Sequence, residues 1–290
     1  MDKFIREYYS TLFCESHDWN TIISEALINF GGKQYPPFGQ IVIVSGGSGS
    51  GKGFVIDNLF GITGKRYDVD FLKTEVQKNE QIRKDLSERF HVPESVFDLK
   101  TAEDVKTVHS LMQLSGIKQK YEANIFAMAK YAPIDKKPNL IFDKTCSNIV
   151  DILTIISTCI NHGYRPENIH LVWVLNDINT ALKQNASRDR QVPPVILTSI
   201  HREVAATMKN FLNNFNEWPE KLNGDIYIVF NKKDKDVKSQ KLKKGKYIPK
   251  NGYFITDSSY IKIKEAGKSN ITIPEDILEK IKQYTPDNIW

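Results

Sequence analysis

The sequence predicts an α/β protein built on a mostly parallel five-stranded sheet with helices on both faces. Five short runs rich in Ile and Val contain few polar residues, as strands buried on both faces do. Segments with apolar residues at helical spacing separate these runs, and such alternation is typical of parallel sheets. The expected strands are residues 40–45, 65–70, 139–143, 169–175 and 225–231.

A long region without strand character separates the second expected strand from the third. Residues 71–135 carry helical patterns only, and we expect them to form a helical insertion that binds an acceptor molecule. One helix is expected to begin after Thr101, because a threonine followed three residues later by an acid, here Asp104, is typical of a capping box.

The two ends of the chain differ from the expected core, which spans residues 37–231. Residues 1–36 are expected to form a leading pair of helices. Residues 232–290 are expected to form a lysine-rich loop and then a small C-terminal extension, made of a hairpin and a helix that begins at Pro274.

Composition indicates an ordinary globular protein of the cytoplasm. Among the 290 residues, 40% are hydrophobic and 26% charged, which is sufficient for a core of useful size. No apolar run approaches the roughly 20 residues of a membrane helix, and we see no secretory signal at the start. The three scattered cysteines argue against a disulfide framework and favour a reducing compartment. We expect a cytoplasmic monomer.

The net charge of +5 is concentrated in one segment. Residues 231–250 contain nine lysines against two aspartates. Such a block is usually a solvated loop. The alternative is a surface that binds the phosphates of a nucleic acid.

A glycine-rich stretch follows the first expected strand and leads directly into a helical pattern. It reads GGSGSGKG, in which Gly46, Gly51 and Lys52 match the phosphate-binding pattern G-x-x-x-x-G-K. Main-chain N–H groups in such a loop surround an anion, and the lysine reaches the β- and γ-phosphates. A flexible linker would not stand between a strand and a helix. The sequence therefore predicts a P-loop NTPase fold, with a nucleotide on Gly46, Gly47, Ser48, Gly49, Ser50, Gly51, Lys52 and Gly53.

The last residue of this loop departs from the pattern. A Ser or Thr hydroxyl ordinarily follows the lysine and binds Mg²⁺, whereas this chain has Gly53. Mg²⁺ tolerates water in place of a protein ligand. We therefore expect ATP or GTP with Mg²⁺, the metal being held through water by Asp143 at the end of the third strand, with Ser48 or Ser50 as further candidates.

Two acids end the second expected strand. Strand alternation places Asp68 and Asp70 on the same face, at the carboxyl edge where such sheets bind ligands. A carboxylate there is suited to accept the proton of an attacking hydroxyl group. The alternative is that Asp70 caps the helix that follows.

Two arginines follow the fourth strand in a segment expected to act as a lid, residues 185–194. Arg188 and Arg190 are suited to stabilise the charge that develops during phosphoryl transfer. The alternative is a pair of surface arginines, one of them bridged to Asp189. Arg202 lies within a helical pattern and is expected at the surface.

The order of these motifs resembles the zeta toxin family of P-loop kinases. The shared motifs are GGSGSGKG, DVDFLK, FDKT and SRDR, and the resemblance spans about residues 38–215. It implies transfer of a γ-phosphoryl group to an alcohol, with Asp70 as the catalytic base and Lys52 as the loop lysine. It also implies that Asp143 and Thr145 contact the acceptor, beside Asp68. Arg188 and Arg190 would bind the phosphates.

The family's known acceptors are UDP-activated amino sugars, and its members can have an inhibitory antitoxin partner. This chain departs from the family at Gly53, at Asp143, where glutamate is usual, and in its short lid. The resemblance therefore implies the reaction more strongly than the substrate.

Three other functions remain open. The first is a polynucleotide, nucleotide or modified-base DNA kinase that uses the lysines of 231–250. The second is a nucleotide-binding regulatory protein that phosphorylates no acceptor. The third is a GTPase, because residues 231–234 read NKKD, although no Asp-x-x-Gly occurs anywhere in the chain.

Overall fold

The structure, a computed structural model, describes most of the chain outside five segments. Arg188 and Arg190 lie outside the described residues, as do most of the leading segment and most of the lysine-rich segment. The described residues are 28–33, 36–186, 192–217, 222–232 and 257–290.

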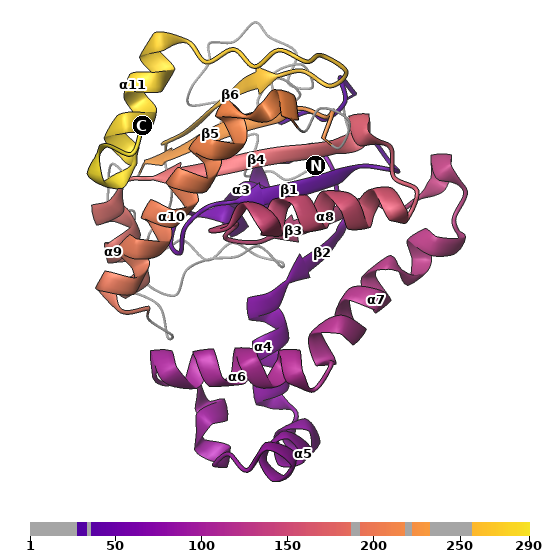
Figure 1. The fold of residues 1–290 in the computed structure, drawn as a ribbon, viewed down its shortest axis with the longest axis vertical. Coiled ribbons are helices and arrows are strands. Elements are labelled where there is room, and N and C mark those ends of the chain that lie inside the picture. The colour runs from indigo at the N-terminus through magenta and orange to yellow at the C-terminus, as the bar shows by residue number, and fades with distance from the viewer. Residues whose placement is uncertain (1–27, 34–35, 187–191, 218–221, 233–256) are drawn as a thin grey trace, which may run out of the picture.

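One six-stranded sheet forms the centre of the molecule, in the order β2-β3-β1-β4-β5-β6 (Figure 1). The first five strands are parallel, and β6 is antiparallel to β5. The predicted α/β class and P-loop type of fold are confirmed, with the strand that precedes the glycine-rich stretch near the centre of the sheet. The strands are β1 (Ile41–Ser45), β2 (Lys65–Asp68), β3 (Leu140–Asp143), β4 (Ile169–Asn176), β5 (Ile226–Lys232) and β6 (Asp257–Lys264).

The sixth strand is a difference from the predicted five-stranded sheet. We expected a separate small hairpin in the C-terminal extension, but β6 pairs along the whole of β5, from Asp257 opposite Lys232 to Lys264 opposite Ile226. An uncovered β5 would leave a row of unpaired main-chain groups at the edge of the sheet. Pairing with β6 satisfies them. The helix predicted from Pro274 is present as α11 (Glu275–Tyr284).

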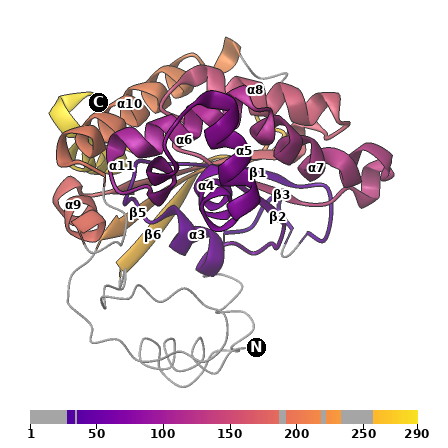
Figure 2. The same cartoon turned by 90° about the horizontal axis from the view of Figure 1, so that it is seen from below.

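Both faces of the sheet are covered, which explains the continuous apolar runs. In β1, Ile41 and Ile43 pack into one apolar cluster, whereas Val42 and Val44 pack into another on the opposite face. Figure 2 shows α3 on one side of the sheet and α8 and α10 on the other. These helices are α3 (Lys52–Asn58), α8 (Ile149–Asn161) and α10 (Pro194–Asn213).

The predicted helical insertion is present and projects beyond the end of β2 (Figure 1). It has an apolar cluster of its own, with Leu86 and Met112 fully buried. The predicted capping box is confirmed: Thr101 accepts a hydrogen bond from the Asp104 amide, and the Asp104 carboxylate accepts one from the Thr101 amide. The helices of the insertion are α4 (Val69–Lys78), α5 (Glu80–Phe90), α6 (Ala102–Leu114) and α7 (Ile117–Tyr131).

The C-terminus packs onto the core. The Trp290 ring stacks on Trp173 of β4, with 5.4 Å between centroids, and its indole N–H donates to the Ala205 carbonyl. Arg202 is exposed, as expected from the sequence, and it pairs with Asp287. In the part of the chain that the structure describes, no helix has the length and apolar character needed to cross a membrane.

Candidate nucleotide-binding site

The glycine-rich loop, residues 46–51, connects β1 to α3. Gly49 and Gly51 have φ angles of +77° and +88°, a left-handed conformation that costs other residues energy. A Cβ atom on Gly49 would lie 2.8 Å from the Ala181 carbonyl oxygen of α9 (Ile178–Ala186). The loop therefore depends on glycine both for its conformation and for its close contact with α9.

Two buried asparagines hold this loop from the ends of neighbouring strands. Asn176 of β4 donates from Nδ2 to the Gly49 carbonyl at 3.2 Å, and Asn231 of β5 donates to the Ser50 carbonyl at 2.7 Å. Sequence reasoning missed both as loop-binding residues. Their signal is a polar residue that ends an otherwise apolar strand. Of the NKKD motif, Lys233 and Asp234 lie outside the described residues.

A histidine of α10 supports the loop from a third side. The His201 Nε2–H donates to the Ser48 carbonyl at 2.8 Å, and the ring lies against Gly47. Burial lowers the pKa of His201, against the effect of the Ser48 contact, and the charge of Lys52 lowers it further. The neutral ring therefore acts as a fixed donor. The sequence contained no motif that marked this residue.

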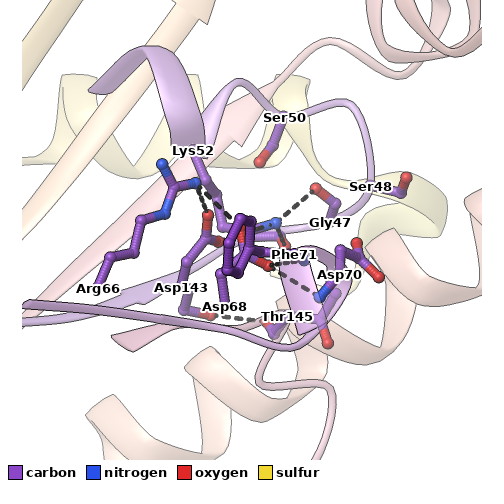
Figure 3. A network of polar contacts seen from close by, with 12 residues as sticks. Gly47, Ser48, Ser50, Lys52, Arg66, Asp68, Asp70, Phe71, Asp143 and Thr145 are labelled. Atoms are coloured by element: carbon purple, nitrogen blue, oxygen red, sulfur yellow. Dashed lines mark hydrogen bonds and ion pairs between the residues drawn. The ribbon is translucent and has the colours of Figure 1, made fainter. Parts of the chain in front are cut away.

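Lys52, the first residue of α3, lies under the loop with its side chain largely buried (Figure 3). Its ammonium group donates to the carbonyl oxygens of Gly46 and Gly47, at 2.8 Å and 3.4 Å. It also lies 4.0 Å from Oδ1 of Asp143. The lysine is thus placed at the loop, as the sequence predicts, and an anion in the loop would replace these carbonyl contacts.

Strand register brings the predicted acids to the same edge of the sheet. Asp68, the last residue of β2, lies beside Asp143, the last residue of β3, and Val44 of β1 lies on the other side of Asp143. The Thr145 carbonyl then accepts hydrogen bonds from the Gly46 amide at 3.2 Å and the Ser45 hydroxyl at 3.1 Å. Asp68, Asp143 and Thr145 therefore gather beside Lys52.

The predicted arrangement of Asp68 and Asp70 is wrong. The strand ends at Asp68, whose Oδ1 accepts from the amides of Asp70 and Phe71 and caps α4. The cap is thus Asp68 rather than Asp70. Asp70 lies in the first helical turn, where its carboxylate pairs with Lys73 at 3.0 Å and its side chain is 70% exposed. Hydrogen bonding by a strand-end aspartate to the following amides starts the helix before the alternation can continue.

Arg66 of β2 is the main charged residue that sequence reasoning missed. Its Nη2 donates to Asp143 Oδ2 and lies 3.5 Å from Asp68 Oδ2, while Nη1 lies 3.7 Å from Asp57 of α3 (Figure 3 shows the pair with Asp143). Burial raises the pKa of both Asp57 and Asp68. The alternation within KRYD places Arg66 on the same face as Asp68, and that is the signal that could have found it.

The described residues do not fit the expected Mg²⁺ site. Asp143, the predicted metal-side acid, has one oxygen on Arg66 and the other near Lys52. Gly53 has no side-chain hydroxyl to offer a metal. Within the described ranges, no three His, Cys, Asp or Glu side chains are grouped as in a metal site built from protein side chains alone. Arg66 thus occupies one oxygen of the carboxylate that was expected to hold the metal.

A basic cluster, defined as Lys73, His109, Lys118 and Lys144, lies near Asp70 between the insertion and the segment that follows β3. Burial lowers the pKa of His109, and the charges of Lys73, Lys118 and Lys144 lower it further, with Asp70 opposing them. Burial likewise lowers the pKa of Lys118, and Lys144 adds to the effect. A lysine such as Lys118, whose charge is disfavoured by burial and by neighbouring lysines, is suited to an anionic ligand.

The ends of the expected lid are joined even though its arginines lie outside the described residues. The Asn185 side chain donates to the Val192 carbonyl at 2.7 Å and accepts from the Val192 amide at 2.9 Å. These bonds bring the end of α9 next to the residues that precede α10. The roles of Arg188 and Arg190 stay predictions.

Comparison with known proteins finds likeness among solved structures only. No known family model matches the chain, and no curated protein matches it. A structure of AvrRxo1-ORF1 with AvrRxo1-ORF2 and sulphate ions is similar over 96% of this chain and 70% of its own, with 12% identity and a TM-score of 0.47. A structure of that complex with ATP gives the same values.

A structure of the PezAT chromosomal toxin–antitoxin system of Streptococcus pneumoniae is similar over 79% of this chain and 76% of its own, with 13% identity and a TM-score of 0.37. At identities and TM-scores this low, these structures do not assign a function to the chain.

Proposed function

We propose that the chain is a zeta-toxin-like kinase that transfers the γ-phosphoryl group of ATP or GTP to a hydroxyl group of a small nucleotide-type acceptor. The observation that supports this most directly is the meeting of the glycine-rich loop, Lys52 and the acids Asp68 and Asp143 at one edge of the sheet. A loop that presents main-chain amides beside a lysine suits a triphosphate, and adjacent carboxylates suit a hydroxyl nucleophile.

The proposal assigns a task to each residue of the site. Lys52 exchanges its contacts with the Gly46 and Gly47 carbonyls for phosphate oxygens. Asp70 takes the proton of the acceptor hydroxyl, whose oxygen forms the new bond to phosphorus as the bond to the nucleoside diphosphate breaks. Arg188 and Arg190 neutralise the transferring group. The acceptor lies against Asp68, Asp143 and Thr145.

The basic cluster supports an acceptor that carries phosphate. Lys73 pairs with Asp70 at 3.0 Å, so a cation of this cluster is in direct contact with the proposed base. A phosphate or diphosphate group bound by these side chains would bring the rest of the acceptor next to Asp70. A UDP-activated amino sugar has this chemistry, and we propose it as the first acceptor to test.

The test is a transfer assay with labelled ATP or GTP and a panel of nucleotide sugars, nucleosides and oligonucleotides. We expect label on a phosphate-bearing small molecule, and loss of that label in Lys52→Ala and Asp70→Asn. Lys130→Ala is the matched control, because Lys130 is an exposed lysine of α7. Nucleotide hydrolysis without any labelled acceptor would overturn the proposal in favour of a regulatory protein, and labelled oligonucleotides would favour a polynucleotide kinase.

A further inference from the structure

The space beside Gly53 is occupied by the Arg66 guanidinium. A Cβ atom built on Gly53 would lie 3.6 Å from Arg66 Nη2. Apart from the two chain neighbours of Gly53 and the main chain of its own helix, no other described atom lies within 4 Å of it. In a common phosphate-binding loop, the Ser or Thr hydroxyl leaves the main chain at this position and binds Mg²⁺. This chain therefore lacks the hydroxyl and has a permanent cation next to the position it would occupy.

Asp143 orients both cations of the site. Its Oδ2 accepts a hydrogen bond from Arg66, and its Oδ1 lies 4.0 Å from the Lys52 ammonium, so the two positive groups flank one carboxylate. Only 10% of the Asp143 side chain is exposed, which restricts how far either partner can turn. This geometry makes Asp143 a positioning residue for two cations, instead of the metal-side acid that the sequence suggested.

Arg66 retains hydrogen-bonding capacity. Its contacts with Asp143 and Asp68 are both made through Nη2. Among the described residues, the one partner of Nη1 is Asp57, at 3.7 Å, beyond hydrogen-bond distance. The side chain is 32% exposed, so solvent, or a ligand in its place, reaches it. A guanidinium presents several N–H donors in one plane and binds phosphate oxygens well.

On the basis of the proposed nucleotide site, we propose that Arg66 contacts the phosphates of the bound nucleotide and takes over the charge-neutralising role of the hydroxyl–Mg²⁺ pair. Nucleotide binding by this chain then depends far less on Mg²⁺ than binding by a loop that ends in Lys-Ser or Lys-Thr. The three carboxylates around Arg66 keep the guanidinium beside the loop in the absence of nucleotide.

The experiment is calorimetric titration of the full chain with ATP and with GTP, in excess Mg²⁺ and in EDTA. We expect the wild-type affinity for the preferred nucleotide to change by no more than about threefold between the two conditions, whereas Arg66→Gln should lose about tenfold or more in EDTA, as expected for a charged phosphate contact. Arg66→Lys, which keeps the charge, should recover part of the loss. Arg89→Gln is the matched control, because Arg89 is an exposed arginine of α5.

Gly53→Ser/Arg66→Gln provides a second measurement that does not depend on a single variant. With the hydroxyl present and the arginine absent, binding should become strongly dependent on Mg²⁺. Circular dichroism and thermal unfolding identify a variant that fails to fold, and Arg66→Lys then decides the question.

The outcomes separate this inference from the proposed kinase. Wild-type binding that disappears in EDTA, together with an Arg66→Gln affinity equal to wild type, overturns the role of Arg66 and leaves the kinase standing. Absence of ATP and GTP binding in both conditions overturns both.

Discussion

Asn231, near the end of β5, donates a 2.7 Å hydrogen bond from its side-chain amide to the main-chain carbonyl of Ser50 in the glycine-rich loop. The two residues are 181 positions apart, and both are fully buried. The loop that follows β1 is therefore held in part by a strand two places away in the sheet. This contact ties the conformation of the proposed nucleotide site to the packing of the whole sheet.

Replacement of Asn231 by alanine should loosen the loop. The Ser50 carbonyl would lose a buried partner, which costs about 1–3 kcal/mol. We expect a lower melting temperature and weaker ATP binding, measured by thermal unfolding and calorimetry. Asn213→Ala, at an exposed position late in α10, should change neither. Unchanged nucleotide affinity in Asn231→Ala would show that the loop keeps its shape without this anchor.

Gly47 and His201 should show strong coupling. A Cβ atom on Gly47 would lie 2.4 Å from the His201 ring, so Gly47→Ala forces the ring or the loop to move, at a cost of about 1–3 kcal/mol. His201→Ala removes the obstacle and the bond to Ser48. In a double-mutant cycle on unfolding free energy, Gly47→Ala should therefore cost much less in the His201→Ala background. Additive effects would mean that the loop relaxes away from α10.

Replacement of Asp70 should mainly lower turnover, whereas replacement of Asp68 should mainly change nucleotide affinity. Asp70→Asn should lower turnover by about 100-fold or more if Asp70 is the base. It should change stability less than turnover, because the Asp70 carboxylate is largely exposed and an asparagine amide oxygen can still accept a hydrogen bond from the buried Lys73. Asp68→Asn retains a good helix cap but loses the charge near Arg66. Its main effect should be on nucleotide affinity. A large loss of turnover in Asp68→Asn, with turnover nearly unchanged in Asp70→Asn, would make Asp68 the base.

The stability of the chain should fall as the pH falls below about 6.5, the usual pKa of histidine. His170 is fully buried: its Nε2–H donates to Gln40 Oε1 at 2.7 Å, and its Nδ1 accepts from the Asp225 amide at 2.8 Å. Burial lowers the pKa of His170 to about 4, despite the adjacent Asp225 carboxylate. The unfolded chain therefore binds the proton first.

The loss should develop between about pH 6.5 and pH 4 and amount to roughly 3 kcal/mol at most. Denaturant unfolding at pH 7.5 and at pH 5 measures it. His170→Gln should be less stable than wild type but less sensitive to pH. Since burial also lowers the pKa of His109 and His201, some sensitivity should remain. His91→Asn, at an exposed helix end, should behave as wild type, and equal pH sensitivity in all three proteins would contradict the assignment.

Much of the fold was predictable because it depends on local pattern. The five parallel strands appear close to their expected positions, and the Thr101–Asp104 capping box forms as expected, since both rest on residues adjacent in the chain. The pairing of β6 with β5 was not predictable in the same way. It depends on which sheet edge remains open, and the chain leaves β5 and returns at β6 after 24 residues that lie outside the described part.

In the candidate site too, some residues were predictable from local motifs and others were not. Lys52, Asp68 and Asp143 were identified from motifs and lie together at one edge of the sheet. The end of β2 was misjudged, because a side-chain cap competes with strand alternation within two residues. Arg66 was overlooked for a different reason. The role of a single basic residue in a strand is not evident until its partners are known. Only Asp68 among the three carboxylates lies in the same strand as Arg66, whereas Asp57 and Asp143 come from α3 and β3.

The amino-acid sequence by itself determined the α/β class, the glycine-rich loop with its lysine, and the glycine that replaces the usual hydroxyl. These follow from residue types at short spacing, which constrain local conformation directly. The tertiary structure alone decided what surrounds that glycine and what holds the loop. Parallel register places Arg66 opposite Ile141, from where its side chain reaches Asp143, and the packing of β5 and α10 brings Asn231 and His201 to the loop. Such contacts join residues distant in the chain, and only the packed sheet and its helices bring them within bonding distance.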